Sequence, residues 1–449
     1  MMKNNKIVAC LDVSSGMLVK GVKFDQIEEI NDPVEAGIKY AEDGVDELVY
    51  YDISATTEDR GIFEQPIIEI SKKIKIPFTV GGGIKTLEDI DRVLKLGATK
   101  VSINSAAVKN PELIKSASDT FGKNRIVVGM DVKKVGDSWK VYLGAGKLET
   151  DLDAIEWAVK CEELGAGELT INSIDNDGVK GGFDLELMRT LAQAVSIPLV
   201  ASGGAGKYED FIDAFKAGSA GALGASVFHF GILDIAKLKE KVLEYKVESL
   251  KYDANGLIPV VVQDARTKAV LIQAYMNKES IRKTIETKSS WFYSRSRDEL
   301  WEKGATSGNT QTVISLYADC DNDSLLLNVI PDGPACHTGA VSCYYNEVID
   351  TGEGIDRGIL FEEFELIKDR LKNPKPGSYT DYLLEEGVDK ICKKIGEEAA
   401  ETIIAAKNNS REELIYESAD LLYHLNVLLV NQGVDLDDIM KEIEERYRK

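Results

Sequence analysis

The first half of the chain alternates short apolar runs with stretches in which apolar residues recur at helical spacing. Each run has the length of a buried strand, and each is followed by an amphipathic helical pattern. Eight such βα units predict a closed parallel (β/α)8 barrel over residues 1–246. The runs are IVACLD, ELVYYD, PFTVGG, KVSINS, IVVGMD, ELTINS, PLVASG and GALGAS.

The predicted barrel contains an internal repeat. PFTVGGGI begins at Pro77 and PLVASGGA begins at Pro198, which is an offset of 198 − 77 = 121 residues. Glu47 and Glu168 have the same offset, since 168 − 47 = 121. The sequence therefore predicts two similar half-barrels.

Two further domains are expected after the barrel. Residues 252–349 carry the strand-like runs NGLIPVVVQD, AVLIQAYM, SWFYSRS, TVISLYAD and SLLLNVI with one short helical segment, SIRKTIET. This pattern predicts a small, mainly-β α+β domain. Residues 357–449 change to helical periods separated by the turn residues NPKPGS and KNNS, and so predict an all-α domain.

Composition narrows the class of protein. The 449 residues are 44% hydrophobic and 29% charged, as in ordinary soluble globular proteins. The net charge of −22 disfavours contact with a phosphate backbone, so no nucleic-acid partner is expected. Since the sequence has neither an apolar run of about 18 residues nor a secretory cleavage pattern, we predict a cytoplasmic protein without a membrane segment.

Polar and small residues follow the barrel strands, where barrel enzymes place their chemistry. Asp12 ends the first strand and Asp131 the fifth, so they are expected to face each other across the barrel mouth. Two opposed carboxylates suit general acid–base catalysis, and capping of the following turns is the alternative. The strand-end residues are Asp12, Asp52, Gly82, Asn104, Asp131, Asn172, Ser202 and Ala225.

Each half-barrel also has a glycine-rich turn. Gly82 and Gly83 lie in GGGI, and Gly203 and Gly204 lie in SGGAG. Ser226, in GASV, marks the start of a further predicted helix. Backbone N–H groups at such positions bind phosphate. The repeat therefore predicts a substrate with a phosphate at each end.

Residues 6–246 resemble the cyclase subunit of imidazole glycerol phosphate synthase in CLDV, VKGVKF, DPVE, TVGGGI, KVSINSAAVKNPEL, VASGGAG and SVFHFG. The resemblance implies that Asp12 and Asp131 catalyse an ammonia-dependent ring closure on a bis-phosphorylated ribulosyl aminoimidazole carboxamide nucleotide. The implied products are imidazole glycerol phosphate and the carboxamide ribotide. Asn172 replaces a usual threonine at the end of the sixth strand. Substrate contacts are implied at Lys20, Asp52, Asn104, Asp177 and Ser202.

Four residues of alternating charge, Lys6, Glu47, Lys100 and Glu168, begin barrel strands and predict a buried salt-bridge layer. In the resembled family a similar ring gates an ammonia passage from a separate glutaminase subunit. We therefore expect a glutaminase partner at this N-terminal face, because no glutaminase motif is visible in the chain. Lys6 stands where the family usually has arginine, which weakens bidentate pairing. The related isomerase, which shares the half-barrel and the opposed aspartates, is the alternative for the barrel.

Three of the six cysteines fall in one stretch, YADCDNDSLLLNVIPDGPACHTGAVSC. Three thiolates, from Cys320, Cys336 and Cys343, leave the fourth position of a tetrahedral zinc open for water. Zinc lowers the pKa of that water to about 7, and His337 can move its proton. By spacing alone, a structural zinc and scattered core cysteines are equally good alternatives.

Three aspartates, Asp319, Asp321 and Asp323, alternate in the same stretch. We expect a strand-like conformation that points them to one face, where clustered carboxylates favour Mg²⁺. The other three cysteines, Cys10, Cys161 and Cys392, are predicted to be buried free thiols.

This segment resembles phosphoribosyl-AMP cyclohydrolase in GLIPVVVQD, AYMN, SRSR, LWEKGATSGN, DCDNDSLLL and GPACHTG. The resemblance implies hydrolytic opening of the adenine ring between N1 and C6. It implies zinc at the three cysteines, with Cys320 donated across a dimer interface, and Mg²⁺ at the three aspartates. A metal that only stabilises the fold is the alternative. Phosphate or base contacts are implied at Arg295, Arg297, Ser307 and Asn309.

The helical tail concentrates carboxylates on two predicted helices. Glu397 and Glu401 lie four residues apart with Glu398 beside them, and Glu417 and Asp420 lie three apart on the second helix. Packed together, these like charges need a cation, and Mg²⁺ bound to pyrophosphate suits such a site. A solvated acidic face is the alternative.

The tail resembles phosphoribosyl-ATP pyrophosphatase in LKNPKPGSYTDYLLEEGVDKICKKIGEEAAETIIAAK and ESADLLYHLNVLL. That family is all-α, dimeric and Mg²⁺-dependent, and releases pyrophosphate from phosphoribosyl-ATP. His424 is predicted to be a packed or capping residue rather than a ligand. All three resembled families belong to histidine biosynthesis, so we predict a multifunctional, homodimeric fusion enzyme. The alternative is that one or more domains are inactive and serve as a docking scaffold.

Overall fold

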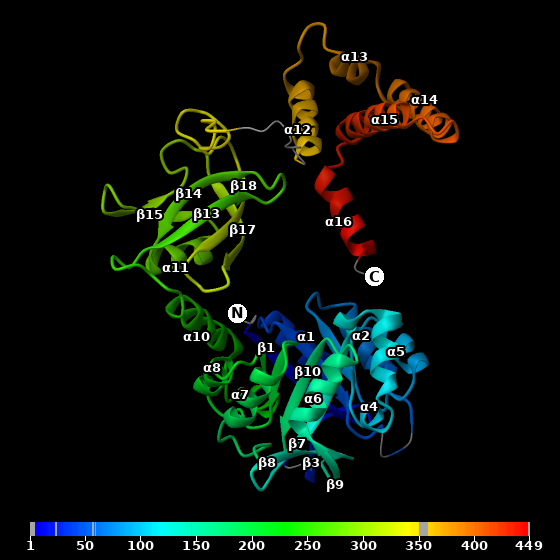
Figure 1. Ribbon diagram of the computed structural model, residues 1–449, viewed down its shortest axis with the longest axis vertical. Helices are drawn as coiled ribbons and strands as arrows, with labels where there is room; N and C mark the ends of the chain where they lie inside the picture. The colour runs from blue at the N-terminus through cyan, green and yellow to red at the C-terminus, as the bar shows by residue number, and fades with distance from the viewer. Residues whose placement is uncertain are drawn as a thin grey trace. The chain divides into compact units, whose positions relative to one another are not determined.

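The computed structural model describes residues 5–22, 25–55, 58, 60–144, 146–349 and 358–447, without the side chains of residues 20–31 and 445. These residues form two compact units, Met1–Ser249 and Leu250–Lys449 (Figure 1). Among them, no helix combines the length and the apolar character that a membrane crossing requires.

Eight parallel strands close into a barrel in the first unit. Each strand pairs with the next in the order β1-β4-β5-β6-β7-β10-β11-β12, and Lys6 of β1 pairs with Gly221 of β12 to close the ring. This confirms the predicted (β/α)8 barrel. The strands are β1 (Lys6–Ser14), β4 (Glu47–Asp52), β5 (Phe78–Gly81), β6 (Lys100–Ile103), β7 (Ile126–Val135), β10 (Glu168–Ser173), β11 (Leu199–Ser202) and β12 (Gly221–Gly224).

The strands are hydrophobic on both faces because helices cover the outside and side chains fill the inside. In β1, Ile7, Ala9 and Leu11 pack outward against the helices, whereas Val8 and Cys10 belong to the inner cluster. The covering helices are α1 (Pro33–Glu42), α2 (Glu64–Ser71), α3 (Leu87–Lys95), α4 (Ser105–Lys109), α5 (Glu112–Phe121), α6 (Ala154–Glu163), α7 (Leu185–Ala194), α8 (Tyr208–Lys216), α9 (Ser226–His229) and α10 (Ile235–Glu248).

The two half-barrels repeat in structure as well as in sequence. Each inserts an antiparallel hairpin after its first strand: β2 (Met17–Val22) with β3 (Asp25–Asn31), and β8 (Ser138–Leu143) with β9 (Leu148–Asp153). The next helices, α1 and α6, begin 154 − 33 = 121 residues apart. Both are N-capped by an aspartate, Asp32 and Asp153, whose carboxylates accept from the backbone N–H two residues later.

The second unit begins with a four-stranded sheet in the order β14-β13-β18-β17, beside a two-stranded sheet, β15-β16. Alternate residues of β13, namely Ile258, Val260 and Val262, are fully buried, as expected for a sheet with one face against a core. The predicted strands and helix are present, and β16 is an additional strand. The elements are β13 (Ile258–Asp264), β14 (Val270–Met276), α11 (Lys278–Thr287), β15 (Trp291–Ser294), β16 (Glu299–Glu302), β17 (Gln311–Ala318) and β18 (Leu325–Pro331).

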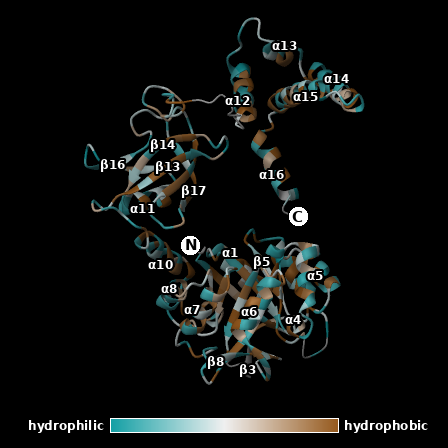
Figure 2. Cartoon of the chain, in the orientation of Figure 1, coloured by the Kyte–Doolittle hydropathy of each residue, from teal (hydrophilic) through white to brown (hydrophobic). Residues whose placement is uncertain are grey.

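The helical part has a small core formed by Phe364, Ile367, Leu383, Ile391 and Val427. In Figure 2 its helices carry both hydrophilic and hydrophobic colours, as amphipathic helices do. The all-α prediction is confirmed, with α13 as an additional short helix. The helices are α12 (Ile359–Lys372), α13 (Tyr379–Glu386), α14 (Val388–Lys407), α15 (Arg411–Gln432) and α16 (Leu436–Tyr447).

The structure contradicts one of the three predictions of a buried free thiol. Cys10 and Cys161 are buried as expected, but Cys392 is exposed, so that prediction was wrong. Cys392 directly follows the fully buried Ile391 on α14, and consecutive helical residues point about 100° apart. An apolar neighbour in the sequence therefore did not indicate burial here.

Candidate functional sites

The barrel mouth gathers polar side chains from several strands. Asp131 ends the part of β7 that lies in the barrel, four strands round the ring from β1, which carries Asp12. The side-chain amide of Asn104 donates to Asp131 Oδ2 (3.0 Å), and that of Asn172 donates to Oδ1 (3.1 Å). Ser202 Oγ donates in turn to Asn172 Oδ1 (3.3 Å). Three predicted strand-end residues thus form one network around Asp131.

The surroundings of Asp131 shift the pKa of its carboxyl group. Burial raises the pKa of Asp131, and the nearby charge of Asp177 raises it further, although the hydrogen bonds from Asn172 and Asn104 oppose the shift. A carboxyl group with a raised pKa can retain its proton and act as a general acid. Across the barrel, Asp12 Oδ1 lies 3.4 Å from the thiol of Cys10.

Asp52, at the end of β4, is hydrogen-bonded to the loop that follows it. It is 1% exposed, and its carboxylate accepts from Arg60 Nη1 (2.7 Å) and Nη2 (2.9 Å). It also accepts from the backbone N–H groups of Ala55 and Phe63, both at 3.1 Å. These hydrogen bonds organise the loop after β4, and the substrate contact that the resemblance implied for Asp52 stays a prediction. The contact with Arg60 had no signal in the sequence.

The glycine-rich turns have a backbone that only glycine accommodates. Gly82 has φ +105°, and a Cβ there would lie 2.2 Å from the carbonyl oxygen of Asp52. Gly204 has φ +118°, and a Cβ there would lie 2.1 Å from the carbonyl oxygen of Gly182. Both positions therefore require glycine. Their neighbours Gly83 and Gly203 also have positive φ.

The helix starts beside these turns match between the half-barrels. Asn104 precedes α4 with φ −128° and ψ −93°, and Ala225 precedes α9 with φ −121° and ψ −83°. Ser226, the first residue of α9, corresponds to Ser105 of α4 at the repeat offset of 226 − 105 = 121. The residue before each of these helices thus has nearly the same backbone conformation in both halves. Lys20 was predicted to contact substrate, but its side chain lies outside the described residues.

At the other end of the barrel, four charged side chains form a closed ring. Lys6 Nζ lies 3.0 Å from Glu47 and 3.5 Å from Glu168, and Lys100 Nζ lies 2.6 Å and 3.1 Å from the same two carboxylates. Burial disfavours the charge of Glu47, but the adjacent lysines outweigh it and lower the pKa of Glu47. The four residues of alternating charge therefore form a salt-bridge layer in the folded barrel, as the sequence predicted.

Two of the three predicted zinc cysteines lie together. Hydrogen bonds from Thr338 lower the pKa of Cys336, which also interacts with the Cys343 thiol. Burial and the neighbouring Cys336 raise the pKa of Cys343. Two adjacent cysteines can both bind one metal ion, and metal binding favours their thiolate forms. His337 is exposed, with Nδ1 3.9 Å from Cys336 Sγ.

Cys320 is not part of this pair. It is exposed in the turn between β17 and β18, where its thiol lies 3.9 Å from Asp321 Oδ1. In the described part of the chain, no group of three or more candidate metal ligands contains a cysteine. The site therefore lacks its third sulfur within the described single chain.

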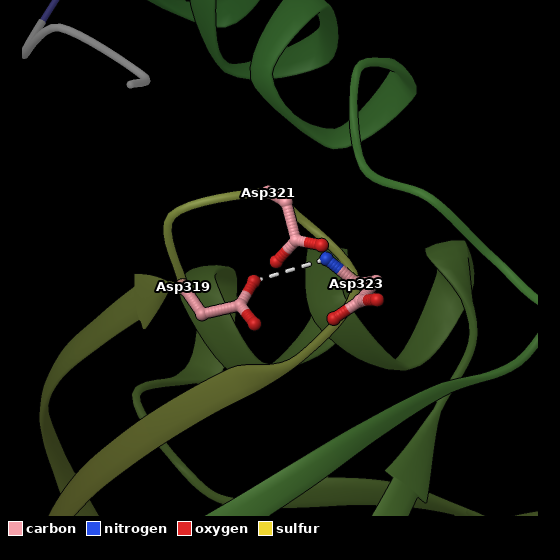
Figure 3. Close-up of side chains that lie close together, drawn as sticks. All are labelled: Asp319, Asp321 and Asp323. Atoms are coloured by element: carbon pink, nitrogen blue, oxygen red, sulfur yellow. Dashed lines mark hydrogen bonds between the residues drawn. The ribbon is translucent and has the colours of Figure 1, made fainter.

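The three aspartates occupy that same turn (Figure 3). The expected strand-like conformation was wrong, because β17 ends at Ala318 and β18 begins at Leu325. The turn itself brings Asp319, Asp321 and Asp323 together, with one carboxylate oxygen of each within 4.8 Å of the others. The charge of Asp321 raises the pKa of Asp323, because neighbouring carboxylates repel each other when both are ionised.

A cavity of about 430 Å³ lies between β14 and the β15-β16 hairpin. Arg295 and Arg297 line it, and the Arg295 guanidinium lies 3.8 Å from the ring centroid of Tyr275. Cationic and aromatic side chains together suit a nucleotide. Ser307 and Asn309 do not line this cavity, and the Asn309 amide instead donates to the carbonyl oxygen of Pro334 (3.1 Å).

The helical part brings together Glu398, Glu417 and Asp420 from α14 and α15, again within 4.8 Å. Burial and the charges of Glu401 and Glu398 raise the pKa of Glu417. Burial opposes ionisation of Glu398 as well, but Lys394, at 2.9 Å, lowers its pKa overall.

The other two predicted ligands of this cluster lie on the exposed side of α14. Glu397 is paired with Lys394 at 3.0 Å, and neither Glu397 nor Glu401 belongs to the group of three. Glu401 still acts on the cluster through its charge. His424 is buried as predicted, with Nδ1 2.8 Å from the carbonyl oxygen of Asp420.

Family models match the chain in three consecutive segments. Residues 6–234 match a histidine biosynthesis protein family, residues 272–345 match phosphoribosyl-AMP cyclohydrolase, and residues 361–447 match phosphoribosyl-ATP pyrophosphohydrolase.

Individual relatives agree for the barrel. It is 52% identical over 240 residues to imidazole glycerol phosphate synthase subunit HisF of Petrotoga mobilis, covering 53% of this chain and 95% of the relative. It is 44% identical over 248 residues to the subunit of the same name from Metallosphaera sedula, covering 55% and 99%. The chain therefore belongs to the histidine biosynthesis family through its cyclase barrel, to which a cyclohydrolase domain and a pyrophosphohydrolase domain are fused.

Proposed function

We propose that the barrel closes an imidazole ring with Asp131 as general acid and Asp12 as general base. The observation that carries this assignment is the buried carboxyl group of Asp131, whose pKa burial raises and whose two oxygens accept from two asparagine amides, on the strand four places round the ring from that of Asp12. The equivalent turns of the two half-barrels would bind the two phosphates of the ribulosyl aminoimidazole carboxamide nucleotide. Asn172 would orient Asp131, since its amide reaches both Asp131 and Ser202.

The charged ring supports a route for ammonia at the opposite end of the barrel. The relatives are named as subunits of a synthase, and we propose a separate glutaminase bound at the strand starts. Lys6, Glu47, Lys100 and Glu168 would form the gate through which ammonia enters. Barrel activity as the related isomerase is the second candidate, but the identity to cyclase subunits across the barrel favours the cyclase.

For the middle domain we propose zinc-dependent hydrolytic opening of the adenine ring of phosphoribosyl-AMP. Cys336 and Cys343 would hold zinc, and the third sulfur would be Cys320 of a second copy in a homodimer. Zinc supplies an activated water, and His337 would carry its proton. The cavity with Arg295 and Arg297 supports nucleotide binding, and the turn of Asp319, Asp321 and Asp323 would hold Mg²⁺.

For the helical domain we propose Mg²⁺-dependent release of pyrophosphate from phosphoribosyl-ATP. Glu398, Glu417 and Asp420 would bind the ion, whose charge neutralises the pyrophosphate. Glu401 and Glu397 would lie outside the group that contacts the ion and would act on it through their charge. We propose domain boundaries at residues 1–246, 252–349 and 357–449.

Three separate assays of the full chain test the proposal. Ammonia-dependent cyclisation, ring opening after addition of zinc, and pyrophosphate release with Mg²⁺ should all be measurable. If a domain serves only as a docking scaffold, its reaction will be absent from a chain that performs the other two.

A further inference from the structure

Hydroxyl side chains lie inside the barrel, between the charged ring at the strand starts and the network around Asp131. Residues two apart on a strand point to the same side of the sheet. On β6, Ser102 lies two residues after the lysine of the ring and two before the asparagine that donates to Asp131 Oδ2. On β10, Thr170 has the same place between the ring glutamate and the asparagine that donates to Oδ1. Both hydroxyl side chains therefore point into the barrel.

Tyr51 reaches the same two side chains from β4. Its hydroxyl lies 3.2 Å from Ser102 Oγ, and it also interacts with the Thr170 side chain. Because β10 lies four strands round the eight-stranded ring from β4, the Tyr51 side chain crosses the barrel interior. Its ring passes close to β5, where a Cβ at Gly81 would lie 2.7 Å from Tyr51 Cε1. Tyr51, Ser102 and Thr170 together form a hydroxyl layer across the barrel.

The two adjacent tyrosines of β4 have different surroundings. Tyr50 is fully buried in the outer cluster against the helices, and its hydroxyl has no hydrogen-bond partner in the described part of the chain. Tyr51 is partly exposed, although it packs against the inner cluster. Part of its surface is therefore open to a molecule of the size of water within the barrel or at its mouth.

The chemistry of the hydroxyl layer suits a small neutral amine. A hydroxyl group can accept a hydrogen bond from an N–H and donate one to a nitrogen lone pair. Burial raises the pKa of Tyr51, so its hydroxyl group stays neutral. Neutral hydroxyl groups offer little to offset the desolvation of an ammonium ion, whereas neutral ammonia loses much less on leaving water.

We propose that the hydroxyl layer of Tyr51, Ser102 and Thr170 binds neutral ammonia between the charged ring and Asp131. This inference rests on the proposed ammonia-dependent cyclisation. The binding uses hydrogen bonds alone, so ammonia keeps its three hydrogens and its lone pair and remains a nucleophile. Ser102 and Thr170 lie only two residues, about 7 Å along the strand, before the asparagines that hold Asp131, so bound ammonia is close to the reaction.

The KM for ammonia in cyclisation by the full chain tests the inference. Ammonia added to the solution is the probe, because binding at equilibrium does not depend on the route of entry. Tyr51→Phe keeps the ring and removes the hydroxyl, so we expect the KM for ammonia to rise roughly threefold to tenfold, as for loss of one hydrogen bond between neutral groups. The kcat and the KM for the nucleotide should be unchanged.

A second position keeps the test independent of Tyr51. Thr170→Val replaces the hydroxyl by a methyl group of similar size and should raise the KM for ammonia by a similar factor. Thr170→Ser retains a hydroxyl and should restore the original value. In the unsubstituted chain, the KM at two pH values should be constant when it is expressed as free ammonia.

Tyr50→Phe is the matched control, because it removes a hydroxyl from the adjacent residue on the outer side of β4 and should change neither KM. An unchanged KM for ammonia in both Tyr51→Phe and Thr170→Val, or an equal rise for ammonia and nucleotide, would overturn the inference. A KM that is constant with pH as total ammonium would overturn it as well. Failure of the proposed function is distinguishable, since the unsubstituted chain would then form no product from nucleotide and ammonia.

Discussion

The barrel and the cyclohydrolase domain assemble their polar sites in different ways. In the barrel, Asp12 and Asp131 are 119 residues apart in the sequence, since 131 − 12 = 119, yet ring closure places them at opposite sides of one mouth. In the cyclohydrolase domain, Cys336 and Cys343 meet, but Cys320 stays in an exposed turn. The described barrel gathers its polar side chains from one chain, whereas the described cyclohydrolase domain leaves Cys320 apart from the cysteine pair, and we propose that a second copy supplies that sulfur.

The largest effect is expected for the cyclisation rate of the barrel. Asp131→Asn should lower the rate of ammonia-dependent cyclisation by about 10³-fold, because the asparagine cannot transfer a proton. Pyrophosphate release and ring opening by the same preparation should be unchanged. Asp137→Asn, an exposed aspartate at the end of the β7-β8 hairpin, is the matched control. Equal loss of all three reactions would indicate misfolding instead.

The next effect concerns the cysteine pair. Cys336→Ser should lower ring opening by about a hundredfold or more and reduce the zinc content of the purified chain, because zinc contributes several kcal/mol to such reactions. Cys392→Ser, the exposed cysteine on α14, should change neither quantity. Metal analysis by mass spectrometry and the ring-opening assay give both readouts. Unchanged zinc in Cys336→Ser would contradict the proposed ligand.

The helical domain resembles the barrel in this respect, since Glu398, Glu417 and Asp420 lie together in one chain. Glu417→Gln should reduce pyrophosphate release by roughly tenfold to a hundredfold and raise the Mg²⁺ concentration needed for half-maximal rate. Glu397→Gln, outside the group of three, should have a much smaller effect. A larger effect at Glu397 than at Glu417 would show that the Mg²⁺ ligands are assigned incorrectly.

The smallest effect is on stability. The pKa of Asp131 is raised in the folded state, so the folded chain binds this proton more tightly than the unfolded chain. Its contribution to stability is full below the ordinary carboxyl pKa and is lost as the pH rises through the raised value. Asp131→Asn should therefore raise the melting temperature of the barrel at pH 8, because it removes a carboxyl group whose ionised form the folded state disfavours.

Calorimetry of the full chain at two pH values measures this difference. The gain should shrink as the pH is lowered toward the ordinary carboxyl range, because Asp131 is then neutral in both states. A gain that is equal at both pH values would mean that ionisation of Asp131 is not its cause.

The sequence predicted the features that depend on long, regular patterns. The offset between Glu47 and Glu168 predicted the half-barrels, and the alternating charges of Lys6 and Lys100 with these glutamates predicted the salt-bridge ring. Strand ends identified Asn104, Asn172 and Ser202, although their network around Asp131 depends on side-chain directions that spacing does not give.

Features that depend on local backbone were predicted poorly. The alternation of Asp319, Asp321 and Asp323 suggested a strand, but Asn322 has φ +65°, a left-handed conformation that turns the chain. The contact of Asp52 with Arg60 was not predicted, because Arg60 lies in an irregular loop without periodicity. Such contacts arise from tertiary packing, which short sequence patterns do not encode.

The most direct test combines two inactive variants of the chain in one dimer. It asks whether a second copy completes the zinc site but not the barrel site. Cys320→Ser and Cys336→Ser chains with different tags should be expressed together, and dimers carrying both tags purified. About half of the wild-type ring-opening rate should return, because one of the two shared sites in each symmetric dimer has no substitution. Asp12→Asn paired with Asp131→Asn should restore no cyclisation. No recovery with the cysteine pair, or recovery with the aspartate pair, would contradict the account.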